Sequence, residues 1–518
     1  MAECPEGTVS SWMATAPVHL HGALTEDIHA DVCIVGAGIA GMTTAYLLAR
    51  EGKSVVVLDD GPVGGGETGR TTAHLAFALD DRFYELERLH GESGSRLAAE
   101  SHRAAVNRIE SIVTEEKIEC DFERVDGYLY ALPGHAVDEL DRELDAAHRA
   151  GLRDVEMMKR APIDAFDTGR CLRFPRQGQF HPLRYLAGLA DAIVRRGGRI
   201  CTDTHVTTMA GGDTAYVETA TGRRVTADAI VVATNSPIND RVVIHTKQAP
   251  YRTYVIGVRV PKGALPHILL WDTADPYHYI RLQGLPSSDG ESAGNDELLI
   301  VGGEDHKTGQ DDDPASHLDC LESWTRERFP MAGEVLFRWS GQVMEPFDGL
   351  AYIGRNPLDD DNVFIITGDS GHGMTHGTIG GMLITDLIMD RENPWADLYD
   401  PSRVNLKAGG EFVKEGANFV AQYTDWVTGG DVASEEEIKP GCGAVLRDGV
   451  TKLAVYRDPE GALHRRSAVC PHAGCIVNWN DLEKSWDCPC HGSRFDPCGA
   501  VLNGPAAVGL AEAEEEES

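Results

Sequence analysis

The hydrophobic pattern near the start of the chain predicts a strand, a helix and a second strand in close succession. Residues 31–35 form a short apolar run that leads directly into the glycine-rich residues 36–41. A helix is predicted through 42–50, and a second apolar run occupies 54–58. This order of elements is typical of a βαβ unit in a parallel sheet.

The glycines between the first strand and the helix indicate a dinucleotide site. Gly36, Gly38 and Gly41 have the GxGxxG spacing that lets the backbone approach a pyrophosphate at a helix N-terminus. Asp59 follows the second strand, where such a fold places the acid that holds a ribose hydroxyl. A plain parallel-sheet turn is the alternative, but it does not explain the acid. We therefore predict an ADP-binding unit.

Beyond this unit the pattern changes twice. Residues 80–118 carry apolar positions at helical spacing, whereas 245–305 is rich in strands, with candidates at 251–260, 277–282 and 298–301. Residues 401–435 mix Gly, Asn and Asp and are predicted to be a linker. The chain is therefore expected to combine an α/β nucleotide fold with an inserted α+β region and a separate C-terminal domain.

Two short boxes near the end of the chain, CPHAGC at 470–475 and CPCHGS at 488–493, indicate a metal centre. Each box offers one Cys and one His, and two thiolates with two imidazoles suit a Rieske [2Fe-2S] cluster. A tetrahedral zinc site from the same ligands is the alternative. Two further cysteines beside the ligands favour the cluster. The predicted ligands are Cys470, His472, Cys488 and His491.

Length and charge set outer limits on these predictions. A chain of 518 residues is long enough for two to four domains at about 150 residues each. No apolar run reaches the about 18 residues of a transmembrane helix, and the N-terminus does not resemble a signal peptide, so a cytoplasmic protein is expected. The net charge of −35 argues against nucleic-acid partners. Residues 511–518 are predicted to be a solvated acidic tail.

Residues 436–510 resemble the Rieske subunit of cytochrome bc complexes. The resemblance implies an all-β domain and a disulfide between Cys475 and Cys490 that ties the two cluster loops together. It also identifies Gly504 and Pro505 with a third loop covering the cluster. Ser493 matches a serine that hydrogen-bonds cluster sulfur, while Phe495 replaces a tyrosine that does likewise. A potential inside the range of about −150 to +300 mV, and below its top, is therefore expected.

The glycine-rich segment 64–74, the apolar strand 229–234 and the closing stretches 348–354 and 363–374 resemble the D-amino-acid oxidase and glycine oxidase family. The resemblance spans about 28–395 and implies FAD on a Rossmann-like fold of the glutathione-reductase type. Its FAD-binding parts would be about 28–80, 170–245 and 340–395, with substrate and helical parts at about 80–170 and 245–340. The implied cofactor-binding residues are Gly36, Gly38, Gly41, Asp59, Gly66, Thr68, Arg70, Thr71, His74, Thr234, Gly371, Gly373 and Met374.

The same resemblance implies oxidation of an amine or amino acid, with hydride passing to the flavin from the carbon next to nitrogen. A helix starting near Thr375 would aim its positive end at the flavin. His74 lies near the position at which some relatives attach flavin covalently. Structural roles in the sheet are the alternative for each substrate candidate. The residues expected around the reacting centre are Arg281, Tyr279, Tyr254 and His372, with Arg252, Tyr277 and the polar segment 302–307 nearby; Arg281 could hold a carboxylate.

No second glycine fingerprint for NAD(P)H stands out, so electrons are expected to come from an organic substrate and to leave singly through the cluster. The acceptor could be a protein, a quinone or oxygen, and the oligomeric state is left open. A redox-carrier or redox-sensing module and a Rieske-fed flavin monooxygenase or demethylase are the alternatives. An oxygenase iron on Asp369, His372 and His376 fits poorly, because their spacing is one residue short. The two cofactor sites are expected to be separable, so that loss of the cluster would leave FAD bound.

Overall fold

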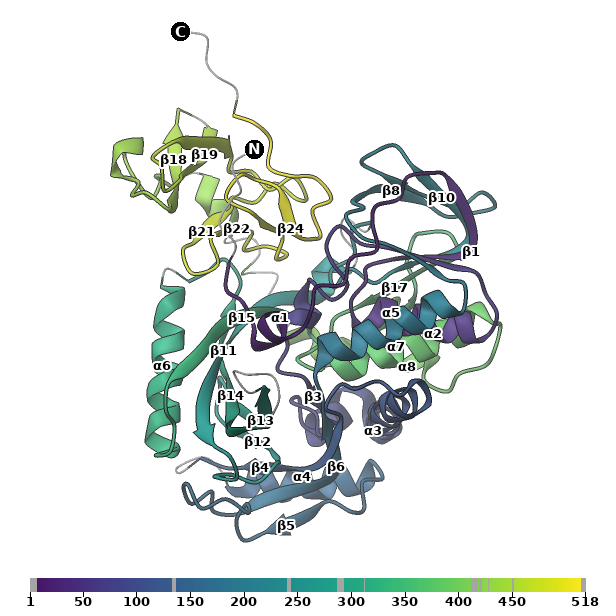
Figure 1. The fold of residues 1–518 in the computed structure, drawn as a ribbon, viewed down its shortest axis with the longest axis vertical. Coiled ribbons are helices and arrows are strands. Elements are labelled where there is room, and N and C mark those ends of the chain that lie inside the picture. The colour runs from purple at the N-terminus through teal and green to yellow at the C-terminus, as the bar shows by residue number, and fades with distance from the viewer. Residues whose placement is uncertain are drawn as a thin grey trace.

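The computed structural model describes three packed units (Figure 1). No described helix is long and apolar enough to cross a membrane. Most of the predicted acidic tail and part of the predicted linker lie outside the described residues. The described residues are 7–132, 137–239, 244–286, 293–311, 313–410, 418, 422–426, 428–449 and 451–513.

The first sheet is built around β1 (Ile28–Val35), which pairs in parallel with β2 (Val55–Leu58) and β10 (Arg224–Val232). Both faces of β1 are buried: Val32 and Ile34 belong to one apolar core, and their neighbours in the strand to another. This explains the unbroken apolar run. The remaining strands are β16 (Tyr352–Arg355), β17 (Val363–Thr367) and β7 (Arg199–Cys201), in the order β16-β17-β10-β1-β2-β7, with β8 (Val206–Ala210) and β9 (Tyr216–Thr219) attached to β10.

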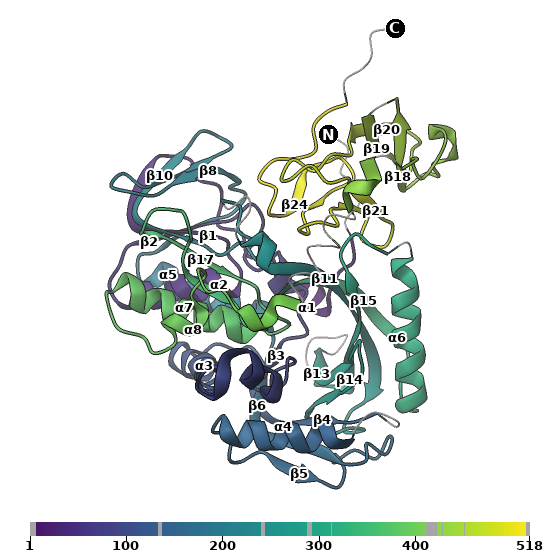
Figure 2. The same cartoon turned by 180° about the vertical axis from the view of Figure 1, so that it is seen from behind.

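Helices cover one face of this sheet, as the two opposite views show (Figures 1 and 2). The predicted crossover helix is α2 (Ile39–Arg50), and α7 (Gly373–Ile388) packs directly against it. The predicted helix near Thr375 is therefore confirmed, with its start two residues earlier. The other helices beside this sheet are α5 (Pro182–Arg195), α8 (Ala396–Tyr399) and the short α1 (Ser11–Thr15).

A second, larger sheet lies beside the first. The strands predicted at 251–260, 277–282 and 298–301 are confirmed as β11, β13 and β14, although β13 begins only at Tyr279. Two strands from segments assigned to the nucleotide fold, β3 and β6, pair with this sheet instead. Its order is β15 (Val335–Pro346), β11 (Gln248–Pro261), β14 (Ala293–Lys307), β13 (Tyr279–Pro286), β12 (Leu269–Asp272), β4 (Glu123–Tyr130), β6 (Cys171–Gln179) and β3 (His74–Leu75), with β5 (Glu156–Met158) on β6.

The helical region predicted at 80–118 forms α3 (Phe83–Glu116), which is kinked at Gly91, where φ is 75°. Two further helices, α4 (Val137–Arg149) and α6 (Pro314–Arg328), flank the second sheet (Figure 1). The inserted α+β region is thus one sheet with helices at its margin.

The C-terminal domain contains two small antiparallel sheets, as expected of an all-β domain. One has β19 at its centre and the other is a meander that carries the cluster boxes. The strands are β18 (Cys442–Asp448), β19 (Thr451–Arg457) and β20 (Leu463–Ser467) in the first, and β21 (Asn478–Asn480), β22 (Ser485–Asp487), β23 (Arg494–Phe495) and β24 (Val501–Asn503) in the second.

A buried ionic network joins this domain to the rest of the chain. The Glu483 side chain is 0% exposed, and its carboxylate lies 3.3 Å from Arg70, 3.6 Å from Arg252 and 3.9 Å from Arg494. Thr8 Oγ1 donates a 2.5 Å hydrogen bond to the same carboxylate. Although burial alone would raise it, the three arginines lower the pKa of Glu483 to about 2. The carboxylate is therefore ionised and compensated by groups from several segments.

Replacing Glu483 with Gln should destabilise the protein, because the buried Arg252 and the partly buried Arg70 would lose their counter-charge, while the buried Arg494 would keep only Asp487. We expect a loss of about 3–5 kcal/mol in the free energy of unfolding, measured by urea denaturation at pH 7. Asp481→Asn, which removes a half-exposed surface ion pair to Lys484, is the control and should cost under about 1 kcal/mol. Equal stability of the two variants would contradict the role of the network.

The same network predicts an acid-sensitive docking. Because the folded-state pKa of Glu483 is about 2 and the ordinary value is 4.5, its contribution is complete above pH 4.5 and declines as pH falls toward 2. Glu483→Gln should remove this part of the acid dependence. Denaturation curves collected at successive pH values, compared between the two proteins, measure the difference.

Candidate functional site

A cavity of about 740 Å³ lies where the first sheet, the second sheet and the C-terminal domain meet. At its floor, the turn after β1 requires glycine. Gly36 has φ 108°, and a Cβ there would lie 2.3 Å from the Ala233 carbonyl oxygen; a Cβ on Gly41 would lie 1.9 Å from the Gly36 carbonyl oxygen. The turn therefore keeps strand, loop and helix close enough for a ligand to approach the α2 N-terminus.

The acid predicted for the ribose lines the same cavity. Asp59 accepts hydrogen bonds from the backbone nitrogens of Ala37, at 2.5 Å, and Gly61, at 2.8 Å. Burial and the neighbouring Asp60 raise its pKa to about 7. The glycine-rich segment contributes Thr68, whose Oγ1 accepts a 3.0 Å hydrogen bond from Ile39 N and so caps α2.

A second helix N-terminus opens onto the cavity. α7 begins at Gly373, and its first residues lie in the cavity wall. Two helix N-termini and a glycine turn suit a dinucleotide with its negative pyrophosphate. Of the predicted cofactor residues, Gly41 packs beneath Gly36, whereas the cavity is lined by Gly36, Gly38, Asp59, Gly66, Thr68, Arg70, Thr71, His74, Thr234, Gly371, Gly373 and Met374.

The roof of the cavity is formed by aromatic rings that lie flat on the second sheet. Tyr279 faces Gly302 on the neighbouring strand, where a Cβ would lie 2.1 Å from the Tyr279 ring. Trp271 likewise lies over Gly127, where a Cβ would be 2.4 Å away. Both rings line the cavity, so the two glycines make room for its apolar surface.

Two carboxylates stand at the same end of the cavity. Tyr277 donates a 2.6 Å hydrogen bond from its hydroxyl to Asp80 Oδ2. Asp305 lies on β14 beside Thr253, whose hydroxyl is 2.5 Å from that of Tyr279. Asp305 Oδ1 is buried and has no hydrogen-bond partner among the described residues. Burial raises the pKa of Asp305 to about 7.

His372 pairs with Asp80. Its Nε2 lies 2.9 Å from the Asp80 backbone nitrogen and 3.3 Å from Asp80 Oδ2. Burial favours the neutral ring, but the neighbouring carboxylates outweigh it and raise the pKa of His372. Burial likewise opposes ionisation of Asp80, yet His372 and Tyr277 lower its pKa. Both shifts favour the charged forms, whereas the hydrogen bond that Asp80 N donates to His372 Nε2 requires that this nitrogen carries no proton; the geometry therefore describes a neutral ring held against Asp80.

His74 also belongs to this wall, with its two ring nitrogens turned toward protein atoms. Nδ1 lies 3.0 Å from Thr72 Oγ1 and Nε2 lies 3.4 Å from the Ile280 carbonyl oxygen. Burial lowers the pKa of His74 to about 3. The ring is therefore neutral and fixed in place.

Arg281 lies elsewhere than predicted. It is buried, does not line the cavity, and donates to the carbonyl oxygens of Thr72, Ala73 and Phe180 at 2.9–3.2 Å. The buried guanidinium is therefore committed to these backbone carbonyls and does not face the cavity in which a substrate would bind.

Tyr254 is also displaced from its predicted role. Thr253 and Val255 line the cavity, and because side chains alternate along a strand, Tyr254 faces the opposite side of the sheet. There its ring stacks on His306 and His317, with centroids 5.5 and 4.9 Å away.

Sequence reasoning missed Asp80 and Trp271. Asp305 lies in the polar segment 302–307, which the sequence analysis placed near the reacting centre. The sequence did not show which residue of that segment faces the cavity. Asp80 follows the glycine-rich segment without a motif of its own, and its role depends on contacts with His372 and Tyr277 from distant segments.

The residues considered for an oxygenase iron have separate partners. His376 Nδ1 lies 2.8 Å from the Asp369 carbonyl oxygen and its Nε2 lies 3.2 Å from His102. The Asp369 carboxylate accepts from Met344 N at 3.0 Å. His372 faces Asp80, so these groups serve the loop and the cavity wall.

In the C-terminal domain the four predicted ligands lie as a cysteine pair and a histidine pair. The Cys470 and Cys488 thiols are within hydrogen-bonding contact, which lowers the pKa of Cys470 to about 7. The rings of His472 and His491 have centroids 4.8 Å apart. This donor set fits a [2Fe-2S] cluster with cysteines on one iron and histidines on the other.

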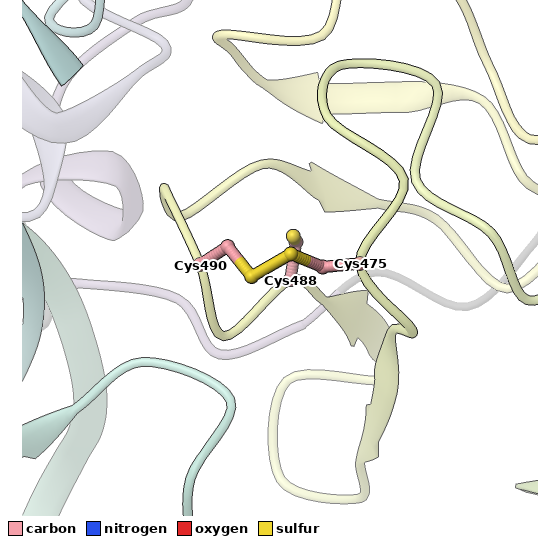
Figure 3. A group of neighbouring side chains, drawn as sticks. All are labelled: Cys475, Cys488 and Cys490. Atoms are coloured by element: carbon pink, nitrogen blue, oxygen red, sulfur yellow. A yellow bond between two sulfur atoms is a disulfide. The ribbon is translucent and has the colours of Figure 1, made fainter. Parts of the chain in front are cut away.

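The disulfide implied by the resemblance is present between Cys475 and Cys490, with Cα atoms 6.4 Å apart. Figure 3 shows Cys488 beside it. Although these three sulfur atoms lie close together, two of them are consumed by the disulfide and only Cys488 keeps a thiol. The disulfide thus joins the two cluster boxes and leaves the four ligands available.

The cluster histidines face the FAD-binding part of the chain. The ring of His245 lies 4.9 Å from His472 and 5.7 Å from His491, and His491 is 6% exposed. On another side, two residues of the predicted linker donate hydrogen bonds to the first box: Tyr423 to the Ala473 carbonyl and Trp426 to the Gly474 carbonyl. Residues 423 and 426 of the predicted linker therefore pack against the first cluster box.

Comparisons with known proteins found relatives of the whole chain and of its FAD-binding part. A Bacillus subtilis (strain 168) protein named as a Rieske 2Fe-2S iron-sulfur protein, YhfW, is 31% identical and aligns over 97% of this chain and 96% of its own length. The gamma-glutamylputrescine oxidoreductase of Escherichia coli (strain K12) is 28% identical over 74% of this chain and 89% of its own.

Among solved structures, glycine oxidase from Geobacillus kaustophilus superposes with a TM-score of 0.59 over 73% of this chain and 99% of its own, at 20% identity. That likeness shows the fold of the first two units. Residues 31–387 match the FAD dependent oxidoreductase family, and residues 429–514 match the Rieske [2Fe-2S] domain. The chain therefore belongs to the FAD dependent oxidoreductase family and carries a C-terminal Rieske domain, with FAD and a [2Fe-2S] cluster as its cofactors.

Proposed function

We propose that this protein oxidises a cationic amine and delivers the electrons through its own Rieske cluster to an external acceptor. FAD held between the glycine turn after β1 and the N-terminus of α7 would supply a two-electron hydride acceptor, and a cluster held by Cys470, His472, Cys488 and His491 would supply one-electron transfer to two equivalents of an external acceptor. The substrate would lose a proton from nitrogen and a hydride from the neighbouring carbon, and the resulting imine would react with water to give a carbonyl compound and a free amine. The remaining chemistry belongs to side chains around the cavity.

The observation that carries this proposal is the charge at the substrate end of the cavity. Asp80 and Asp305 stand there with Tyr277 and Tyr279. Among the described residues that line the cavity, Arg70 is the only Lys or Arg, and its guanidinium is engaged by Glu483 and the Ser340 carbonyl. A substrate carboxylate would meet Asp80 and Asp305, and the nearby His372 already faces Asp80, whereas an ammonium would gain a counter-charge.

Asp305 is suited to receive that ammonium. Its Oδ1 is buried without a partner, so a substrate N–H would satisfy it. Because burial brings its pKa to about 7, the carboxylate can also accept the proton that the ammonium must lose before its neighbouring carbon is oxidised. Asp80, already paired with His372, would add negative potential without titrating in the same range.

Two findings support an electron route through the cluster. His245 lies against both cluster histidines, so the cluster faces the FAD-binding part rather than solvent. The YhfW relative shares nearly the full length of the chain, including the Rieske domain. The name of the Escherichia coli relative, which refers to an amine, agrees with the proposed substrate class.

Anaerobic mixing with a substrate panel tests the proposal directly. Amines without a carboxylate near the reacting nitrogen should bleach the flavin absorbance and then reduce the cluster, whereas the matching α-amino acids should react far more slowly. N-methylated amino acids and NAD(P)H complete the panel. If every amine leaves the flavin oxidised while a reduced partner protein bleaches it, the chain is a redox carrier and the enzyme proposal fails.

Asp305→Asn should lower kcat/KM for the amine about 10- to 100-fold, since a charged hydrogen bond of about 1.5–3 kcal/mol would be weakened. The rate of anaerobic flavin bleaching measures the effect, and the FAD content should not change. Asp296→Asn, on the same strand but in an outward pair with Arg259, is the matched control and should react like the unmodified protein.

Amine binding should strengthen as pH rises through about 7, because Asp305 is neutral below that pH and ionised above it. The groups that act on Asp305 are Asp80 and Glu304, which raise its pKa, and Thr253 and His278, which lower it. The increase in binding strength should end at the pH at which the free amine loses its own proton, about pH 10. In Asp305→Asn the step near pH 7 should disappear; its persistence would assign the titration to another group.

A further inference from the structure

The third loop of the Rieske domain forms one wall of the dinucleotide cavity. Residues 500–504, 506, 507 and 509 line the same cavity as the glycine turn after β1 and the N-terminus of α7. Figures 1 and 2 both show β24 and the chain after it facing the FAD-binding unit. We propose that this loop is part of the FAD-binding site, so that FAD retention depends on the Rieske domain.

The first tether of the loop runs to the glycine-rich segment. Asn503 Nδ2 donates a 2.9 Å hydrogen bond to Glu67 Oε1. The other oxygen of Glu67 accepts from Gln342 N at 2.7 Å. Glu67 stands immediately before Thr68, which caps α2. The Rieske loop therefore holds in place the segment that shapes the pyrophosphate end of the site.

The second tether lies beside the predicted ribose acid. His205 is placed with Nε2 2.8 Å from the Ala507 carbonyl oxygen and Nδ1 3.3 Å from Asp60 Oδ2. Asp60 directly follows Asp59, and both line the cavity. The loop thus closes over the end of the cavity that is expected to hold the ADP half of the cofactor.

The loop is also bonded to the cluster boxes. Ser493, two residues after the ligand His491, is fully buried and accepts a 3.1 Å hydrogen bond from Ala506 N through its Oγ. Its carbonyl oxygen accepts from Cys488 N at 2.8 Å. A short series of hydrogen bonds therefore runs from the cluster ligands through Ser493 and the loop to His205. This differs from the sequence-based expectation that the two cofactor sites are separable.

Asn503→Ala tests the proposal on the full-length protein loaded with both cofactors. We expect FAD to dissociate about tenfold faster, because the hydrogen bond to the Glu67 carboxylate is lost together with the 3.3 Å hydrogen bond that Asn503 Oδ1 accepts from Arg494. The rise of flavin fluorescence after dilution measures the rate. The Rieske electron paramagnetic resonance signal should be unchanged, which shows that the domain is intact.

The matched control is Asn478→Ala. Asn478 Nδ2 donates a 2.8 Å hydrogen bond across the same domain interface to the Gly309 carbonyl, but neither residue lines the cavity. It should release FAD at the unmodified rate. If both variants release FAD equally fast, or neither differs from the unmodified protein, the loop is no part of the site.

A second measurement needs no variant. Hydrogen exchange of backbone amides in 500–509 should slow when FAD is added to the FAD-depleted protein, while the exposed residues of the β18–β19 hairpin keep their rate. Unchanged exchange in 500–509 would overturn the proposal. Because neither readout involves substrate, the result stands apart from the amine proposal.

Discussion

The arrangement of the whole molecule depends on the burial of one carboxylate, that of Glu483. Guanidinium groups reach it from three places: Arg70 in the segment beside the FAD cavity, Arg252 in β11 of the second sheet, and Arg494 in the Rieske domain itself. A buried charge is costly unless its partners are all in position. Movement of the Rieske domain away from the cavity would therefore leave charges uncompensated, and the docked arrangement is held by this requirement.

The docking has a consequence for both cofactor sites. It places Asn503 and Ala507 against the dinucleotide cavity and places His245 against the two cluster histidines. One interface thus closes the cavity and covers the cluster's histidine side. Glycine oxidase from Geobacillus kaustophilus covers 73% of this chain, and here residues 500–504, 506, 507 and 509 of the Rieske domain add a wall to the cavity. The cluster ligands and the dinucleotide cavity are consequently parts of one packed arrangement.

The electrostatic potential changes sign from one end of the cavity to the other. Two helix N-termini and a glycine turn offer positive potential to the dinucleotide, while Asp80 and Asp305 give the other end a negative potential. Aromatic rings and burial keep water from weakening these interactions, which is why the pKa of Asp305 rises to about 7. The contrast favours a negatively charged cofactor and a positively charged substrate in adjoining spaces.

The amino-acid sequence by itself located the glycine turn of the FAD site and the four cluster ligands, because each of these groups depends on residues close together in the chain. The spacing of Gly36, Gly38 and Gly41 follows from a local turn, and the two boxes at 470–475 and 488–493 bring their own ligands and disulfide. The strands at 31–35 and 54–58 could be predicted for the same reason: burial on both faces leaves an unbroken apolar run.

Only the tertiary structure decided which side chains meet at the substrate end and which domain closes the cavity. Tyr254 faces the side of its strand that packs on His306 and His317, and backbone carbonyls from two segments, at 72–73 and at 180, bind Arg281; these partners lie far from both residues in the chain. Asp80 gained its role from contacts with Tyr277 and His372, which lie 197 and 292 residues away along the chain. The wall at 500–509 depends on a docking of two separately folded regions, and the charges that fix it are individually ordinary in the sequence.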